Sequence, residues 1–107
     1  MTVDKSLLAG STTMLVLKLL DGQDMYGYQM IEELSRRSER AFALKTGTLY
    51  PLLHSLDEKD EGAARPRRYY HLERKGQHLL REKEVEWATF TTAVDRVLKG
   101  GVCLGSA

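Results

Sequence analysis

The residues best suited to bind a ligand lie in the stretch 45–56, which reads Lys-Thr-Gly-Thr-Leu-Tyr-Pro-Leu-Leu-His-Ser-Leu. Its leucines recur at steps of three and four, which predicts a helix with one buried face. Pro51 has no amide hydrogen, so we expect it in the first turn, with the helix starting near residues 46–48. The outward side chains are short, polar and partly basic: Lys45, Thr46, Thr48, Tyr50, His54 and Ser55.

Such a helix start is suited to phosphate oxygens. The unpaired amides and the helix dipole both favour an anion there, and Lys45 adds a positive charge. A helix of this kind could enter a groove of DNA. The alternative is an ordinary capped surface helix, which is the commoner explanation when these residues are considered alone.

A second basic segment follows at residues 65–72, where Arg65, Arg67 and Arg68 precede two tyrosines. The pattern predicts a strand with Tyr70 and Leu72 facing inward and with Tyr69 and His71 on the other face. Arginines beside tyrosines on a strand indicate an edge that grips phosphates. A solvated run of charge is the alternative.

Composition limits the function classes. The chain has 107 residues, which predicts one domain, and its 16 Lys and Arg nearly balance its 15 Asp and Glu. An anionic partner must therefore be met by a local patch. Cys103 is the only cysteine, which excludes an internal disulfide and a cysteine-based zinc site. With neither a signal peptide nor an apolar run near ~20 residues, we expect a cytoplasmic protein.

Two helices should precede the polar stretch. The first is expected over residues 6–20, with apolar side chains on more than one face, and the second over 25–37, capped by Asp24. Gly27 inside the second helix suggests the close approach of another helix or of a ligand, and we favour packing. Together with the helix at 45–56, these elements predict a helix-turn-helix arrangement.

A long helix is expected over residues 74–99, followed by a small, flexible tail at 100–107. Its heptad pattern places apolar residues along one seam, which seeks another helix from the same chain or from a second chain. The seam consists of Leu80, Lys83, Trp87, Phe90, Val94 and Val97.

With these segments assembled, the chain resembles the PadR family of winged-helix transcriptional regulators, in particular its short members with one C-terminal helix. The resemblance is carried by Leu-Leu-Ala-Gly-Ser-Thr at 7–12, Met-Tyr-Gly-Tyr-Gln-Met at 25–30, Gly-Thr-Leu-Tyr-Pro-Leu-Leu-His-Ser-Leu at 47–56, Arg-Arg-Tyr-Tyr-His-Leu at 67–72, and Lys75 with Gly76. It implies a mainly α fold with a small β-wing. Residues 1–73 would form a winged helix-turn-helix domain and residues 74–99 a dimerisation helix.

The resemblance also implies a function: a homodimeric, sequence-specific DNA-binding regulator, commonly a repressor, that recognises an inverted-repeat operator. The helix at 47–56 would read the major groove and the arginine-tyrosine strand, with Tyr69, would form the wing. The implied dimer interface comprises Leu8, Leu15, Leu80, Trp87, Phe90, Val94 and Val97.

Trp87 also suggests ligand control. Two indoles near a two-fold axis can flank a flat aromatic guest, with Met14 as an adaptable wall, whereas the alternative is that Trp87 only fills the interface. For the protein as a whole, the rival function is a dimeric helical interaction module that does not bind DNA.

Nothing in the sequence indicates an enzyme, a cofactor or a metal site. The three histidines, His54, His71 and His78, fall on different expected elements. Neither a nucleophile elbow nor a glycine-rich phosphate loop nor a pair of catalytic carboxylates is present.

One feature departs from the family pattern. A wing needs two strands, but residues 57–64 contain no β-branched or aromatic residue. Either this protein has lost the first strand, or the sequence lacks a wing-tip segment near Asp60 and Glu61. In the second case these two residues would not be neighbours in the protein, although their numbers are consecutive. We favour the second explanation, because Arg68 to Leu72 would otherwise be an unpaired strand.

Overall fold

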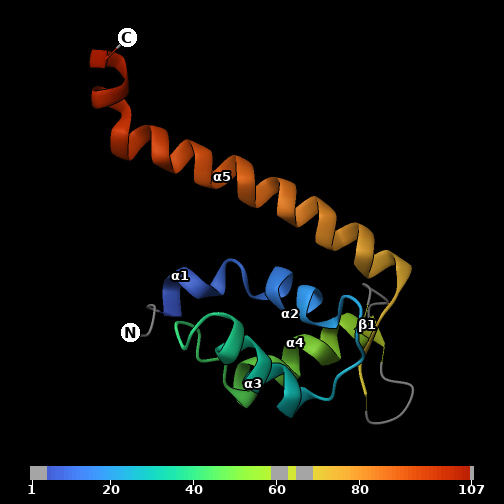
Figure 1. Ribbon diagram of the computed structural model, residues 1–107. Coiled ribbons are helices and arrows are strands. Elements are labelled where there is room, and N and C mark those ends of the chain that lie inside the picture. The colour runs from blue at the N-terminus through green and yellow to red at the C-terminus, as the bar shows by residue number, and fades with distance from the viewer. Residues whose placement is uncertain (1–4, 59–62, 65–68, 107) are drawn as a thin grey trace.

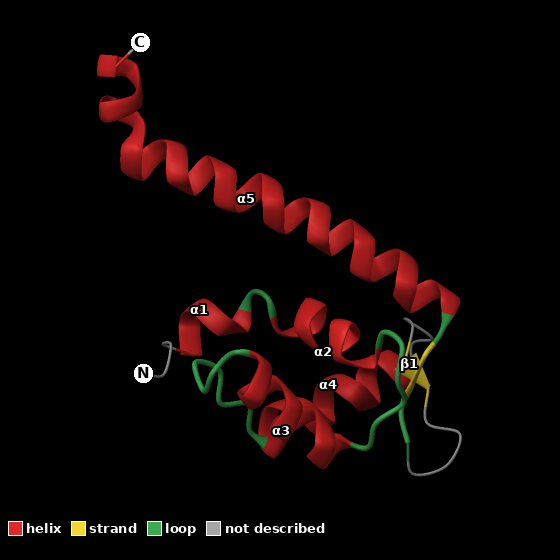
Figure 2. Cartoon of the chain, viewed as in Figure 1, coloured by secondary structure: helices red, strands yellow, loops and turns green. Residues whose placement is uncertain are grey.

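The chain is mainly α-helical with a very small β-hairpin, as the sequence predicted. The computed structural model describes residues 5–58, 63–64 and 69–106. Within these ranges the helices are α1 (Lys5–Ala9), α2 (Thr12–Leu20), α3 (Gly27–Arg37), α4 (Thr46–Glu58) and α5 (Arg74–Ser106), and the strands are β1 (Ala63–Ala64) and β2 (His71–Leu72) (Figures 1 and 2).

The hydrophobic core lies where α2, α3 and α4 meet. Helix α2 contacts α3, β2 and α5, while α4 contacts α3 and β1. Apolar side chains at helical spacing become fully buried there, and this burial is the main force that holds the helices together. The largest fully buried side chains are Val16, Leu17, Leu19, Leu20, Met30, Leu49 and Leu53.

The single helix expected over residues 6–20 is wrong, because the chain forms two helices with a break at Gly10 and Ser11. Three donors converge on the carbonyl oxygen of Leu8: the Ser11 amide at 2.9 Å, the Ser11 hydroxyl at 3.1 Å and the Thr12 hydroxyl at 3.0 Å. Hydroxyl side chains that bond nearby backbone groups compete with a regular helix. The Ser-Thr pair therefore ends α1 and starts α2.

Helix α3 begins at Gly27 and not at Met25, and Asp24 is not its cap. The Tyr26 amide instead donates to the side-chain oxygen Oε1 of Gln29 at 3.0 Å. Met25 forms an antiparallel bridge with Tyr70, in which each amide donates to the other residue's carbonyl. Because its backbone is paired with an extended segment, Met25 cannot join the helix.

Helix α4 starts at Thr46, within the predicted region, but Pro51 does not lie in its first turn. It lies five residues after Thr46, where its missing amide deprives the Gly47 carbonyl of the usual helical donor. Gly47 is exposed, so water can satisfy that carbonyl. An exposed carbonyl is what makes an interior proline tolerable here.

The wing has both strands, which corrects the expectation that the first is missing. Ala63 pairs with Leu72 and Ala64 with His71, in antiparallel register. Strand pairing uses backbone N–H and C=O groups, which alanine also carries, so a segment without β-branched residues can still form a strand. The suspected omission near Asp60 and Glu61 lies outside the described residues, and the pairing removes the reason for proposing it.

The inward and outward faces of the second strand are as predicted. Tyr70 and Leu72 are both 6% exposed, while Tyr69 and His71 face outward.

Helix α5 runs past the expected end at Lys99 and reaches Ser106. Its first turns pack against the core through Leu79 and Leu80. Beyond these turns the helix runs past α2 along one side of the domain and diverges from it (Figure 1). The molecule measures 57 × 30 × 21 Å along its principal axes. Most residues of α5 from 81 to 99 are exposed in the single chain.

A pair of adjacent leucines on α4 tests the core. Leu53 is fully buried and Leu52 only partly, so Leu53→Ala should destabilise the fold by roughly 2–5 kcal/mol and Leu52→Ala by clearly less. Urea unfolding followed by circular dichroism measures both free energies. Equal losses for the two variants would contradict the orientation of α4.

Candidate nucleic-acid interface

The predicted contact residues of α4 lie on its solvent side. Leu49, Leu53 and Leu56 are buried, at 0%, 0% and 3% exposure, and this fixes which way the opposite face points. Ser55 is half-buried, and the other outward residues are exposed: Lys45, Thr46, Thr48, Tyr50 and His54. The structure therefore brings the predicted α4 residues together on one surface.

The start of α4 has the chemistry expected of an anion site. The amides of Thr48 and Leu49 both donate to the carbonyl of Lys45, at 3.0 and 2.9 Å. The preceding amides, of Thr46 and Gly47, have no carbonyl within the helix to bond. Two such amides beside the Lys45 side chain and the Thr46 and Thr48 hydroxyls can accept a phosphate group.

The wing contributes Tyr69, which is 46% exposed. It makes an edge-on contact with Tyr26, with 5.3 Å between ring centroids and 61° between ring planes. The arginines assigned to the wing, Arg65, Arg67 and Arg68, lie outside the described residues.

The exposed face of α4 also includes a contact with α3 that the sequence indicated only in part. A Cβ atom added to Gly27 would lie 2.5 Å from the Tyr50 hydroxyl oxygen, so the Tyr50 ring covers this glycine. The prediction that Gly27 reflects packing is therefore confirmed. Tyr26 was not singled out, because its partner Tyr69 is far away in the sequence and no local pattern links them.

Helix α5 carries an exposed apolar stripe along the predicted seam. The exposed fractions are 44% for Trp87, 59% for Phe90, 36% for Val94 and 82% for Val97. The rings of Trp87 and Phe90 lie side by side, with 5.8 Å between their centroids. Leu98, at 75%, extends the stripe.

The other predicted interface residues have less surface to offer. Leu80 and Leu8 are already buried, at 3% and 8%, and Leu15 is half-buried against the core. Met14, which was predicted to line a ligand pocket, is half-buried there as well. A periodic pattern alone could not separate Leu80, which packs within its own chain, from the exposed positions further along the same seam.

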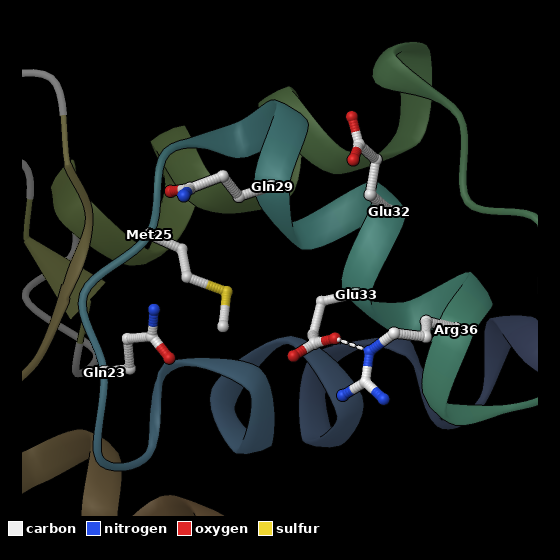
Figure 3. A pocket seen from close by; sticks show the side chains of 6 residues that line it. All are labelled: Gln23, Met25, Gln29, Glu32, Glu33 and Arg36. Atoms are coloured by element: carbon white, nitrogen blue, oxygen red, sulfur yellow. Dashed lines mark hydrogen bonds and ion pairs between the residues drawn. The ribbon is translucent and has the colours of Figure 1, made fainter.

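An open hollow of about 370 Å³ lies between α3 and the loop before it, lined by Gln23, Met25, Gln29, Glu32, Glu33 and Arg36 (Figure 3). Glu33 and Arg36 form an ion pair within it. The Arg36 hydrogen bond lowers the pKa of Glu33, and the same bond raises the pKa of Arg36. The charges of this pair thus largely neutralise each other.

In the part of the chain that the structure describes, no three His, Cys, Asp or Glu side chains gather as metal ligands would. None of the described helices combines the length and apolar character needed to cross a bilayer.

Comparison with known proteins agrees with this architecture. Residues 16–82 match the model of the transcriptional regulator PadR-like family. The chain is 28% identical over 106 residues to an uncharacterized protein of Lysinibacillus sphaericus, and the match covers 92% of this chain and 97% of that protein.

Solved structures are similar along most of their length. A transcriptional regulator from Clostridium thermocellum has a TM-score of 0.78 at 19% identity, covering 88% of this chain and 96% of that one. A PadR family transcription regulator from Clostridium difficile has a TM-score of 0.67 at 27% identity, covering 82% and 98%. Because the family match spans well over half of the chain and the fold agrees, the chain belongs to the PadR-like family of transcriptional regulators, which are transcription factors and not enzymes.

Proposed function

We propose that the protein is a homodimeric repressor that binds an inverted-repeat DNA operator and is released by a small aromatic ligand. The observation that carries the DNA-binding part is the outward face of α4, where Lys45, Thr46 and Thr48 surround unpaired helix amides. In helix-turn-helix proteins the second helix of the motif lies in the major groove and contacts base edges with its first residues. Helix α4 has this place after α3.

The contacts divide into two kinds. On α4, six side chains face the major groove, where they can contact base edges and set sequence preference: Lys45, Thr46, Thr48, Tyr50, His54 and Ser55. Arg65, Arg67 and Arg68, beside Tyr69, hold phosphates and act on affinity more than on sequence choice. The arginine assignment rests on the sequence pattern alone.

Dimerisation is supported by the apolar stripe of α5. The domain covers only the first turns of this helix, and the stripe of Trp87, Phe90, Val94 and Val97 stays exposed in the single chain. Burying it against a second copy removes a large apolar surface from water. A symmetric dimer that presents two α4 helices to one face of DNA needs them about 34 Å apart, or a multiple of that distance.

Ligand control rests on Trp87, which is 44% exposed beside Phe90. In a dimer these rings meet their own copies near the two-fold axis, where a flat aromatic molecule can insert. Met14, half-buried on α2, supplies a polarisable wall. Such a ligand lowers DNA affinity only if it prefers a dimer geometry in which the two α4 helices no longer match the operator.

The alternative is a dimeric interaction module without DNA binding. The exposed α5 stripe favours it, because that surface alone would explain a dimer. One experiment distinguishes the two functions. A sequence-specific regulator selects a defined inverted repeat from a pool of random DNA duplexes, and an interaction module does not. We place the regulator in the cytoplasm.

The wing arginines should set the salt dependence of binding. The double variant Arg67→Ala with Arg68→Ala should weaken binding to the selected duplex and to unrelated duplexes alike. It should also reduce the slope of log affinity against log salt by about two units, one per lost phosphate contact. Fluorescence anisotropy at several salt concentrations measures this slope. The charge-matched control is Arg96→Ala with Lys99→Ala, on exposed positions of α5, and should leave the slope unchanged. An identical slope for both double variants would rule out the wing assignment.

A charge on the α5 stripe should prevent dimerisation. Phe90→Asp would bury an unpaired carboxylate in the interface, so the variant should sediment as a monomer at micromolar concentration. Val85→Asp is the matched control: Val85 is 67% exposed but points away from the stripe, so this variant should remain a dimer. A dimeric Phe90→Asp protein would show that another surface joins the copies.

Planar cationic dyes should quench the fluorescence of Trp87, the only tryptophan. We expect saturable quenching at tens of micromolar dye, and a parallel loss of DNA binding. The Trp87→Ala variant, followed through the dye's own fluorescence, should lose saturable binding. Absence of quenching, or dye binding that survives in Trp87→Ala, would leave Trp87 with a packing role only.

A further inference from the structure

Residues 24–27, just before and at the start of α3, each lie against the wing or against α4, the two elements proposed to bind DNA. The Asp24 carboxylate accepts a hydrogen bond from the His71 imidazole, with 2.8 Å between Oδ1 and Nδ1. Met25 pairs with Tyr70 through both backbone bonds, at 2.7 and 3.2 Å. The ring of Tyr26 contacts that of Tyr69.

The fourth residue, Gly27, lies against α4, the helix proposed to read DNA and called the recognition helix below, instead of the wing. A Cβ built on it would meet three atoms of the Tyr50 ring end within 2.5–2.7 Å, which is closer than real Cβ contacts allow. Any side chain at position 27 must therefore displace that ring. Gly27 is also buried and lies in a helix, where glycine is a poorer choice than alanine.

We propose that residues 24–27 act as a positioning clamp, which holds the wing through Tyr26 and holds Tyr50 of the recognition helix through Gly27. The proposal rests on the proposed DNA-binding function, and it assigns to Gly27 and Tyr26 a part in DNA recognition without contact to DNA. Tyr50 is only half covered, at 41% exposure, so its ring lies between α3 and the surface offered to DNA. Its orientation is what the glycine sets.

A purely structural role for Gly27 would give a different result. The atoms that an added Cβ would meet are the far end of a side chain, so the Tyr50 ring can swing aside while the backbone stays in place. The clamp thus requires that Gly27→Ala preserve the fold and alter recognition. If Gly27 only supported the fold, Gly27→Ala would lower the stability of the protein and its DNA binding together.

The contact itself is tested by NMR without DNA. The Tyr50 ring should shift the resonance of a Gly27 Hα proton upfield, and the shift should vanish in Tyr50→Ala and persist in Tyr50→Phe, which keeps the ring. If the chemical shift of the Gly27 Hα protons is the same in Tyr50→Ala as in the unaltered protein, the clamp is wrong. A clear ring shift in a protein that binds no DNA sequence would instead overturn the proposed function.

The role in recognition is tested by a double-mutant cycle on the selected duplex. Gly27→Ala should weaken specific binding about tenfold, keep the thermal midpoint, and have less than about a twofold effect in the Tyr50→Ala background. Gly10→Ala is the control, because a Cβ there meets nothing within 4 Å, and it should bind normally. Independent effects of Gly27→Ala and Tyr50→Ala would contradict the proposal.

The wing half of the clamp has its own cycle. Tyr26→Leu should weaken binding about threefold, and have no further effect when Tyr69 is already leucine. Tyr28→Leu is the matched control: Tyr28 is a neighbouring tyrosine, 62% exposed, and the change should leave affinity within twofold. Additive losses from Tyr26→Leu and Tyr69→Leu would remove the wing from the clamp.

Discussion

Burial of the leucine face of α4 is the constraint on which the rest of the structure depends. Leu49, Leu53 and Leu56 must leave water together, and a helix allows this in only one rotation about its axis. That rotation exposes the polar residues between the leucines. The same packing energy that stabilises the domain thus sets the direction in which Lys45 and Thr48 point.

The small sheet serves as a connector more than as a layer. Its two strands are two residues long, too short to be stable alone, and the Met25–Tyr70 bridge adds one further pairing. The buried Tyr70 and Leu72 side chains attach it to the core. The wing therefore takes its orientation from the helices, and the start of α3 is where the two meet.

Helix α5 is anchored at one end only. Leu79 and Leu80 fasten its first turns to the core, whereas the stripe from Trp87 onward has nothing of its own chain to cover it. The exposed stripe supports the proposed assembly, in which the same stripe of a second copy would cover it. The proposed regulation and the proposed assembly then share one surface, because a ligand between the Trp87 residues would change the geometry of the dimer.

The sequence by itself determined the elements whose signal is local. Leucine spacing gave the buried face of α4, the alternation of Tyr70 and Leu72 gave the inward face of β2, and the family motifs gave the winged-helix class. Helix ends were less predictable: hydroxyl groups at Ser11 and Thr12 divide the first helix, and proline tolerance at Pro51 depended on the exposure of Gly47.

Only the tertiary structure decided the contacts between distant segments. The pairing of alanine residues in β1 uses backbone groups that every residue carries, so composition could not reveal it. The same holds for Asp24, which bonds His71 rather than capping a helix, and for Gly27, whose partner Tyr50 lies on another helix. Local patterns specify which surfaces must be buried, but which segment buries them depends on the packing of the whole chain.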